Sequence, residues 1–290
     1  MIRIGILQLT QNLDDAVDGF KQELEKLNLA ATFIYKNADG NVPLLSKLAQ
    51  ALLDNHVDLI FACSTPSALA AKALNGKIPV IFTPVFDPIS TGLIDTMSAP
   101  GGKVTGMSGM VNAADKVSFL KQLLPTAKKV AMLVPTEDQN TQIEAANFRI
   151  AAKNNIKLQE IPINKQTEIS LLSEKLTDDL DALFLPIGRI LEENFSSIAY
   201  YAETAGIPII ASYAPNVSMG ALGALCANHS NLGEACAKQA KAILIDGKDP
   251  KDIPVGIQAE PDILLNAFVA DNLAISLPTD LLVKAKEIFN

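Results

Sequence analysis

Hydroxyl side chains gather where an apolar run gives way to a predicted helix. Ser64, Thr65 and Ser67 follow the run 59–63, and Pro66 occupies the first turn of that helix. Ser or Thr can cap a helix, and the unpaired N–H groups at its start attract a carboxylate or another small anion. The segment predicts either an anion-binding helix start or a plain N-cap.

A second polar segment, "FTPVFDPISTGL", is stiffened by prolines and offers Thr83, Phe86 and Asp87. Asp87 precedes Pro88, so its carboxylate is interpreted either as a ligand-binding group or as a helix cap. The aromatic rings of Phe86 and Tyr213 are candidates for stacking on an apolar or aromatic part of a ligand.

Cysteine chemistry offers an alternative. Cys63 and Cys226 each end an apolar run, which is how a two-thiol, cofactor-independent amino-acid racemase places its bases. Against this reading, buried cysteine is usually a small apolar side chain. The chain has three cysteines, the third being Cys236, and they do not have the spacing of metal ligands. Only His56 and His229 could supplement them. Neither a disulfide framework nor a zinc site is therefore favoured. No metal and no cofactor is predicted.

Glycine-rich segments do not match nucleotide-binding fingerprints. "APGGKVTGMSG" lacks the Lys-Ser/Thr ending of a phosphate loop, and "GILQLTQN" lacks the glycines of a dinucleotide site. No Ser/His/Asp order or carboxylate pair stands out either, so the sequence favours a binding protein over an enzyme.

The composition excludes several classes of partner. The 290 residues are 49% hydrophobic, with a net charge of −8 and 24 scattered Lys and Arg residues, so a nucleic-acid partner is disfavoured. No apolar run reaches the length of a membrane-spanning helix. The chain opens with a predicted strand, "MIRIGILQLT", which means either a cytoplasmic protein or one whose export signal has been removed.

Short runs rich in Ile, Val and Leu alternate with segments of helical periodicity, the pattern of parallel sheets covered by helices. The predicted strands are 2–8, 31–35, 59–63, 80–82, 104–107, 130–134, 157–162, 182–185, 208–211 and 221–226. The predicted helices are 13–27, 42–55, 66–74, 113–124, 141–154, 169–177, 192–205 and 232–245. The pattern restarts at Lys129 just after Pro125, and regular repetition ends after Asp246. We therefore prefer two open sheets to an eight-stranded barrel.

Ligands of open parallel sheets bind beyond the carboxyl ends of the strands. The predicted ligand-binding residues lie in those loops: Gln8, Thr10, Ser64, Thr65, Ser67, Thr83, Phe86, Asp87, Ser108, Asn140, Pro186, Arg189, Ser212, Tyr213 and Asn228.

Several segments, in order and spacing, resemble one protein family. These are "ACSTPSALAAKAL", "IPVIFTPVFDPISTGLI", "PGGKVTGMSG", "LLPTAKKVAMLV", "GIPIIASYAPNVSMGALGAL" and "LLNAFVADNLAISLP". Together they are similar to the substrate-binding proteins of bacterial ABC transporters, of the tryptophan/phenylalanine-binding type. The resemblance covers nearly the whole chain.

The resemblance implies a class I periplasmic-binding-protein fold. Two Rossmann-like α/β lobes with parallel sheets would be joined by three hinge crossovers and close on a small ligand in the cleft between them. The lobes are predicted as 1–112 with 229–255 and 113–228 with 256–290. The implied partners are a small molecule and the membrane subunits of an ABC permease. The chain would be a monomer in the periplasm or anchored by lipid outside the cell membrane.

The site residues also follow the resemblance, with departures. Ser64, Thr65 and Ser67 match the family's "TPSA" carboxylate-binding loop, and Thr83 and Asp87 match its "TxxxDP" loop. Ser108 matches a "TGxSD" motif whose acidic position is Gly109 here. The "PxDN" loop, ammonium-binding in relatives, reads Pro186-Ile187-Gly188-Arg189, and "HPALD" is replaced by residues 10–14, "TQNLD".

These departures bear on the ligand, because a buried charge without a partner costs several kcal/mol. The acidic position of the "PxDN" loop is the neutral Gly188 here, and Arg189 adds a positive charge beside it. The sequence therefore predicts a neutral or anionic ligand, or an amino acid held chiefly by Asp87. A solvent-exposed Arg189 is the competing interpretation. The effector half of a transcriptional regulator is a further alternative, but no helix-turn-helix precedes Ile2.

Overall fold

The computed structural model describes residues 1–290, which divide into two compact units. Unit 1 comprises residues 1–110 and 227–259, and unit 2 comprises residues 111–226 and 260–290. Neither unit is continuous in sequence. The limits expected at 112, 228 and 255 lie within a few residues of these boundaries.

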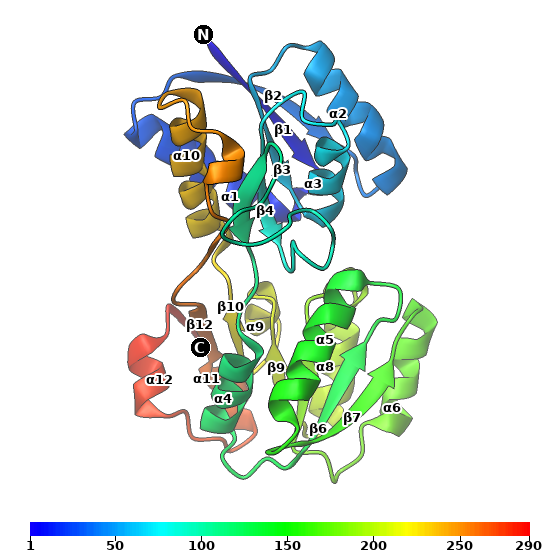
Figure 1. Cartoon of the computed structure of the whole chain (residues 1–290). Helices are drawn as coiled ribbons and strands as arrows, with labels where there is room; N and C mark the ends of the chain where they lie inside the picture. Colours follow the sequence, from blue (N-terminus) through cyan, green and yellow to red (C-terminus); the bar gives the residue numbers. More distant parts are fainter. The chain divides into compact units, whose positions relative to one another are not determined.

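Unit 1 contains a sheet of six strands, all parallel, in the order β11-β5-β4-β3-β1-β2 (Figure 1). The strands are β1 (Ile2–Gln8), β2 (Ala31–Asn37), β3 (Leu59–Cys63), β4 (Val80–Val85), β5 (Val104–Ser108) and β11 (Gly256–Ile257). The helices are α1 (Asp14–Lys26), α2 (Leu45–Asp54), α3 (Thr65–Lys72) and α10 (His229–Leu244), with single 3-10 turns at Gln11–Leu13, Val42–Leu44 and Pro250–Asp252.

Both faces of the inner strands β1, β3, β4 and β5 are buried, which explains why these strands read as continuous apolar runs, whereas the edge strand β2 is partly exposed. Ile4 and Ile6 of β1 join the core beneath α1 and α10, while Leu7 joins the core beneath α2 and α3. On the first face, the rings of Phe20 and Phe61 stack with centroids 4.1 Å apart.

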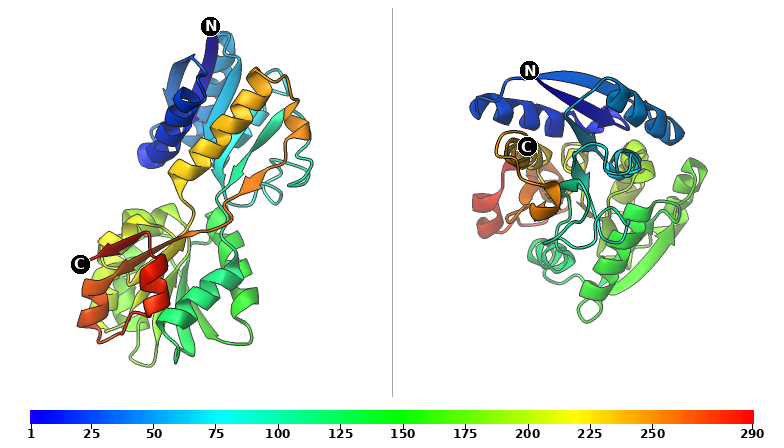
Figure 2. Two further views of the ribbon diagram at one scale, coloured as in Figure 1. Left: turned by 90° about the vertical axis from the view of Figure 1, so that its left-hand side faces the viewer. Right: turned by 45° about the horizontal axis from the view of Figure 1, so that its top comes forward.

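Helix α10 returns from the second half of the chain and packs along α1 (Figure 2). Two glycines permit this close approach. A Cβ at Gly233 would lie 2.0 Å from the carbonyl oxygen of Ala16, and one at Gly19 would lie 2.3 Å from that of Ser230. The segment 227–259 is therefore built into the core of unit 1.

Unit 2 contains a sheet of seven strands in the order β13-β12-β10-β9-β8-β6-β7. They are β6 (Lys129–Val134), β7 (Lys157–Pro162), β8 (Ala182–Leu185), β9 (Ile209–Ala211), β10 (Gly223–Cys226), β12 (Asp262–Asn266) and β13 (Glu287–Phe289). The helices are α4 (Ala113–Leu123), α5 (Gln139–Ala152), α6 (Leu172–Lys175), α7 (Arg189–Glu193), α8 (Phe195–Thr204), α9 (Pro215–Ser218), α11 (Ala267–Asn272) and α12 (Thr279–Lys284), with a 3-10 segment at Gln166–Leu171.

The prediction of parallel sheets needs one correction in unit 2. Strand β12 runs antiparallel to β10, while β13 runs parallel to β12. Both strands lie in the stretch after Asp246, where the sequence has lost its regular alternation. At the other end of the strand order, α5 packs against β6 and β7, and the ring of its Phe148 stacks on that of Phe184 in β8 with centroids 3.9 Å apart.

Two predicted helices are wrong in form. The helix expected at 169–177 is a 3-10 segment followed by the four residues of α6. The helix expected at 192–205 is two helices, because the chain leaves helical geometry at Asn194, whose side-chain amide donates to the carbonyl of Ile190 at 2.8 Å. None of the helices in the chain has the length and apolar character needed to cross a membrane.

Candidate functional site

The start of α3 has the geometry expected for a small-anion site. Ser64 adopts a left-handed backbone conformation with φ of 97°, and its hydroxyl accepts a hydrogen bond from the Ser67 N–H at 3.4 Å. The two hydroxyl oxygens lie 3.0 Å apart. Ser64 is half-buried, whereas Thr65 and Ser67 are buried. The N-cap interpretation is confirmed, and the cap places two hydroxyls at the helix start. Anion binding at this helix start stays a prediction.

Gln8, at the carboxyl end of β1, is engaged within unit 1. Its amide donates to Asp14 Oδ1 at 3.1 Å, and its Oε1 is hydrogen-bonded to the Tyr35 hydroxyl. That hydroxyl also lies 3.0 Å from Asp14 Oδ1, and partial burial raises the pKa of Tyr35. Thr10 is half-buried and precedes the first 3-10 turn without capping it through its side chain.

Asp87 closes its own loop. Its Oδ1 accepts from the N–H groups of Ile89 and Ser90 at 3.1 and 3.0 Å, and its Oδ2 accepts from the Ser90 hydroxyl at 2.7 Å. The residues that follow form turns rather than the helix that one interpretation required. Both carboxylate oxygens are thus already hydrogen-bonded, and the role of Asp87 in ligand binding stays a prediction.

Other predicted residues of unit 1 also make internal contacts. The buried Ser108 hydroxyl donates to the carbonyl of Phe86 at 2.8 Å and accepts from the Met110 N–H at 3.1 Å, tying the ends of β5 and β4 together. The Thr83 hydroxyl lies beside the Cys236 thiol of α10. Asn228 caps α10 by accepting from the Asn231 N–H at 2.9 Å, and its own N–H donates to Gln258 Oε1 at 2.7 Å.

A buried charge cluster, whose two charged residues are absent from the predicted site, lies in unit 2. Lys116 of α4 forms an ion pair with Glu144 of α5, and the two side chains are 3% and 2% exposed. Ser212, which follows β9, donates to Glu144 Oε1 and accepts from Lys116 Nζ at 2.9 Å. Glu144 Oε2 accepts from the Ile187 N–H at 2.7 Å. The cluster joins two helices to the loops after β8 and β9.

The sequence does contain a signal for this cluster. Lys116 occupies the apolar stripe of its helix with Leu120 and Leu123, and Glu144 shares the buried face of α5 with Phe148. A charged residue at a helical spacing reserved for the core is buried only when it is paired. That argument points to both residues individually, although it does not show that they meet.

Arg189 does not contribute an isolated charge. It is the first residue of α7, its side chain is 62% exposed, and its Nε lies 3.9 Å from Glu193 Oε1. The competing interpretation of a solvent-exposed arginine agrees with the structure, except that Arg189 lies in a helix rather than a loop. Pro186 is buried in the preceding loop.

Acidic residues lie next to that loop instead. Glu192 Oε1 accepts from the Gly188 N–H at 3.2 Å. Burial raises the pKa of Glu192 to about 7, with the hydrogen bond from Gly188 opposing the shift and the nearby carboxylates of Asp138, Glu193 and Glu144 adding to it. At the start of α5, Asp138 accepts from the Thr141 N–H at 3.1 Å, and Asn140 is half-buried in the first turn. Tyr213 is also half-buried.

The three cysteines are free and buried. Burial raises the pKa of the Cys63 thiol far above its ordinary value and that of Cys226 to about 12. Such thiols stay protonated at neutral pH and do not supply the thiolate that a racemase base requires. Nothing in the structure favours the racemase interpretation.

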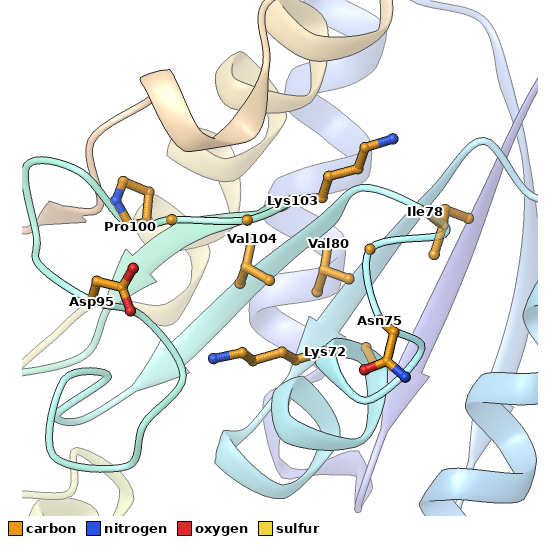
Figure 3. A pocket seen from close by; sticks show the side chains of 12 residues that line it. Lys72, Asn75, Ile78, Val80, Asp95, Pro100, Lys103 and Val104 are labelled. Carbon is orange, nitrogen blue, oxygen red and sulfur yellow. The ribbon is translucent and has the colours of Figure 1, made fainter.

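A cavity of about 390 Å³ lies in unit 1 at the amino ends of β4 and β5, the edge opposite the predicted ligand loops (Figure 3). Lys72 and Asp95 point toward the same space, while Lys103 points away. The Lys72 ammonium donates to the carbonyl of Gly92 at 2.7 Å. None of the predicted ligand-binding residues lines this cavity.

Comparisons with known proteins agree with this architecture. Residues 3–289 match the family model of the ABC transporter substrate-binding proteins. The chain is 33% identical over 272 residues to a tyrosine-binding protein of Clostridioides difficile, covering 91% of this chain and 78% of that protein. The match to the family model alone spans nearly the entire chain.

Two solved structures are similar to this chain over nearly its whole length. A ligand-free, open substrate-binding protein with adhesive properties from Clostridium difficile is 29% identical, with a TM-score of 0.86 over 100% of both chains. An ABC domain from Streptococcus pneumonia, solved in complex with L-Trp, is 24% identical, with a TM-score of 0.89 over 99% of both chains. The chain belongs to the family of ABC transporter substrate-binding proteins.

Proposed function

We propose that this protein captures a free L-amino acid with an aromatic side chain, tyrosine or tryptophan, and delivers it to an ABC permease. Family membership supports the delivery role. The relative at 33% identity is named for tyrosine binding, and a structural neighbour holds L-Trp. The ligand class is transferred from these proteins to this chain as a proposal.

The observation that supports this proposal most directly is the start of α3. Ser64 and Ser67 present two hydroxyls at the positive end of a helix dipole, an arrangement suited to the carboxylate of an amino acid. We assign the ligand carboxylate to this helix start. The remaining predicted site residues and closure of the two lobes on the ligand stay predictions.

The hypothesis of an anionic ligand loses one of its two reasons. It depended on two missing carboxylates and on the positive charge of Arg189, which is exposed and lies near Glu193. Exposed charges are screened by solvent and contribute little to the potential at a binding site. A zwitterionic amino acid is therefore preferred to an anionic ligand.

Family membership implies an extracytoplasmic protein. Its attachment to the membrane by lipid and its monomeric state are further proposals. Mass spectrometry of the protein from its native membrane fraction tests for a lipid, and analytical ultracentrifugation with and without L-tyrosine tests for a monomer.

The carboxylate assignment is testable by fluorescence, because the chain contains no tryptophan. The emission of added L-Trp therefore reports binding without tryptophan emission from the protein. Ser67→Ala should weaken L-Trp binding by about tenfold, since a hydrogen bond to a charged group contributes about 1.5–3 kcal/mol. Ser46→Ala, on the exposed face of α2, is the matched control. Equal affinities of the two variants would contradict the assignment.

A further inference from the structure

The Lys116–Glu144 ion pair of unit 2 carries a large desolvation penalty. Removing an ammonium or a carboxylate from water costs several kcal/mol, and well-packed apolar side chains of similar volume are often equally or more stabilising. Both side chains of this pair are almost completely buried. Stability alone therefore does not explain a charged pair at this position, and its other contacts are informative.

Those contacts reach two loops of the sheet edge. Glu144 Oε2 accepts a hydrogen bond from the N–H of Ile187, which lies in the loop after β8. Glu144 Oε1 accepts one from the hydroxyl of Ser212, which follows β9. Strands β8 and β9 are neighbours in the sheet, and both loops lie at carboxyl ends, where ligands of such sheets bind. One carboxylate thus fixes a backbone amide and a side chain on adjacent loops.

Lys116 completes the arrangement. Its ammonium lies against Glu144 and donates to the Ser212 oxygen at 2.9 Å. A hydroxyl has one proton to donate, and Ser212 gives it to Glu144. Ser212 is therefore oriented from both sides and can only accept a further hydrogen bond. A donor on the ligand is compatible with this state, and an acceptor is not.

We propose that Lys116 and Glu144 are positioning residues of the ligand site, which hold Ile187 and Ser212 in the binding geometry; this rests on the proposed function. The pair acts through the hydrogen bonds that it makes to the loops. Its contribution to ligand affinity is consequently separable from its contribution to stability, because apolar replacements fill the same volume without making those bonds.

The decisive variant is Lys116→Met/Glu144→Leu, which keeps the volume and removes the hydrogen bonds. We expect an affinity for L-Trp lower by about tenfold or more, and a thermal midpoint lowered only by the loss of the partners of Ile187 and Ser212, since the apolar pair itself is well tolerated. Lys116→Gln/Glu144→Gln, which keeps amide donors and acceptors, should bind within about threefold of the wild type. Arg149→Gln/Glu160→Gln removes an exposed pair that includes another residue of α5 and is the control.

Amide hydrogen exchange of the ligand-free proteins provides a readout that needs no ligand. The Ile187 amide should exchange at least about tenfold faster in Lys116→Met/Glu144→Leu, because it loses its acceptor. Wild-type affinity in that variant, or an unchanged Ile187 exchange rate, overturns the proposal. If the wild type binds no aromatic amino acid, the proposed function fails, and the exchange rate still decides whether the pair holds the loop.

Discussion

The hydroxyl oxygens of Ser64 and Ser67 lie 3.0 Å apart across the first turn of α3. Ser64 reaches this position only because its backbone adopts φ of 97° and ψ of 157°, a region that favours glycine. Strained residues of this kind cost about 1–3 kcal/mol and often occur at ligand sites. The Ser64 side chain therefore stabilises the cap while its backbone conformation opposes folding.

Ser64→Gly should separate stability from binding. Glycine adopts this backbone conformation freely and is nearly as good an N-cap, so the free energy of unfolding should rise by about 1 kcal/mol. The affinity for L-Trp should fall, because a hydroxyl at the helix start is lost. Chemical denaturation and ligand fluorescence measure the two effects. A less stable Ser64→Gly protein would contradict the strain assignment.

Arg189→Ala should have little effect. The side chain is 62% exposed and its nearest acidic partner, Glu193, lies 3.9 Å away. Exposed pairs contribute about 0–1 kcal/mol, so we expect less than about a twofold change in affinity and less than about 0.5 kcal/mol in stability. Calorimetric titration and thermal unfolding check both values. A loss of affinity of tenfold would restore Arg189 to the binding site.

Glu192 should make the protein less stable as the pH rises. Burial raises its pKa from 4.5 to about 7, so between these values the folded state binds more protons than the unfolded state. Its contribution to the free energy of unfolding then falls with rising pH through this range, by about 2 kcal/mol after allowance for solvent screening, and is constant above pH 7.

Denaturation of the wild type and Glu192→Gln between pH 4.5 and 7 measures this effect by difference, which cancels the contribution of other groups such as His229. Glutamine keeps an acceptor for the Gly188 N–H without titrating. Parallel stability curves for the two proteins would show that the Glu192 carboxyl is not perturbed.

The thiols should be unreactive in the native protein. Cys63 and Cys236 are fully buried and Cys226 is 5% exposed. A thiol-specific reagent such as DTNB should label them only after unfolding, and Cys63→Ala/Cys226→Ala should retain amino-acid binding. Loss of binding in that variant together with racemisation of free tyrosine by the wild type would revive the racemase hypothesis.

The inner strands of the sheets could be predicted because burial on both faces leaves a pattern within each strand's own sequence. Strands such as Leu59–Cys63 and Ala182–Leu185 are buried on both faces, so their apolar runs are continuous and bounded by polar loops. The tail was not predictable in this way. Strand β13 is short and partly exposed. It pairs with β12, from which it is separated in the sequence by helices α11 and α12.

The sequence predicts the loops that follow the carboxyl ends of the strands, but it does not predict the partners of their side chains. Ser212 was expected to face a ligand, and the structure directs its proton to Glu144. Asp87 was expected to offer a carboxylate, and its own loop occupies both oxygens. These outcomes depend on which donors the folded chain brings within 3 Å, information that residue type and spacing do not contain.

Capture of an aromatic amino acid is tested most directly by calorimetric titration with L-Tyr, L-Trp and L-Phe. The protein is first unfolded to release any copurified ligand and then refolded. We expect saturable binding of L-Tyr or L-Trp, one molecule per chain, with micromolar or stronger affinity and an at least about tenfold preference over the D-enantiomer. Absence of binding by all three amino acids, in a protein whose circular dichroism shows it to be folded, would contradict this expectation.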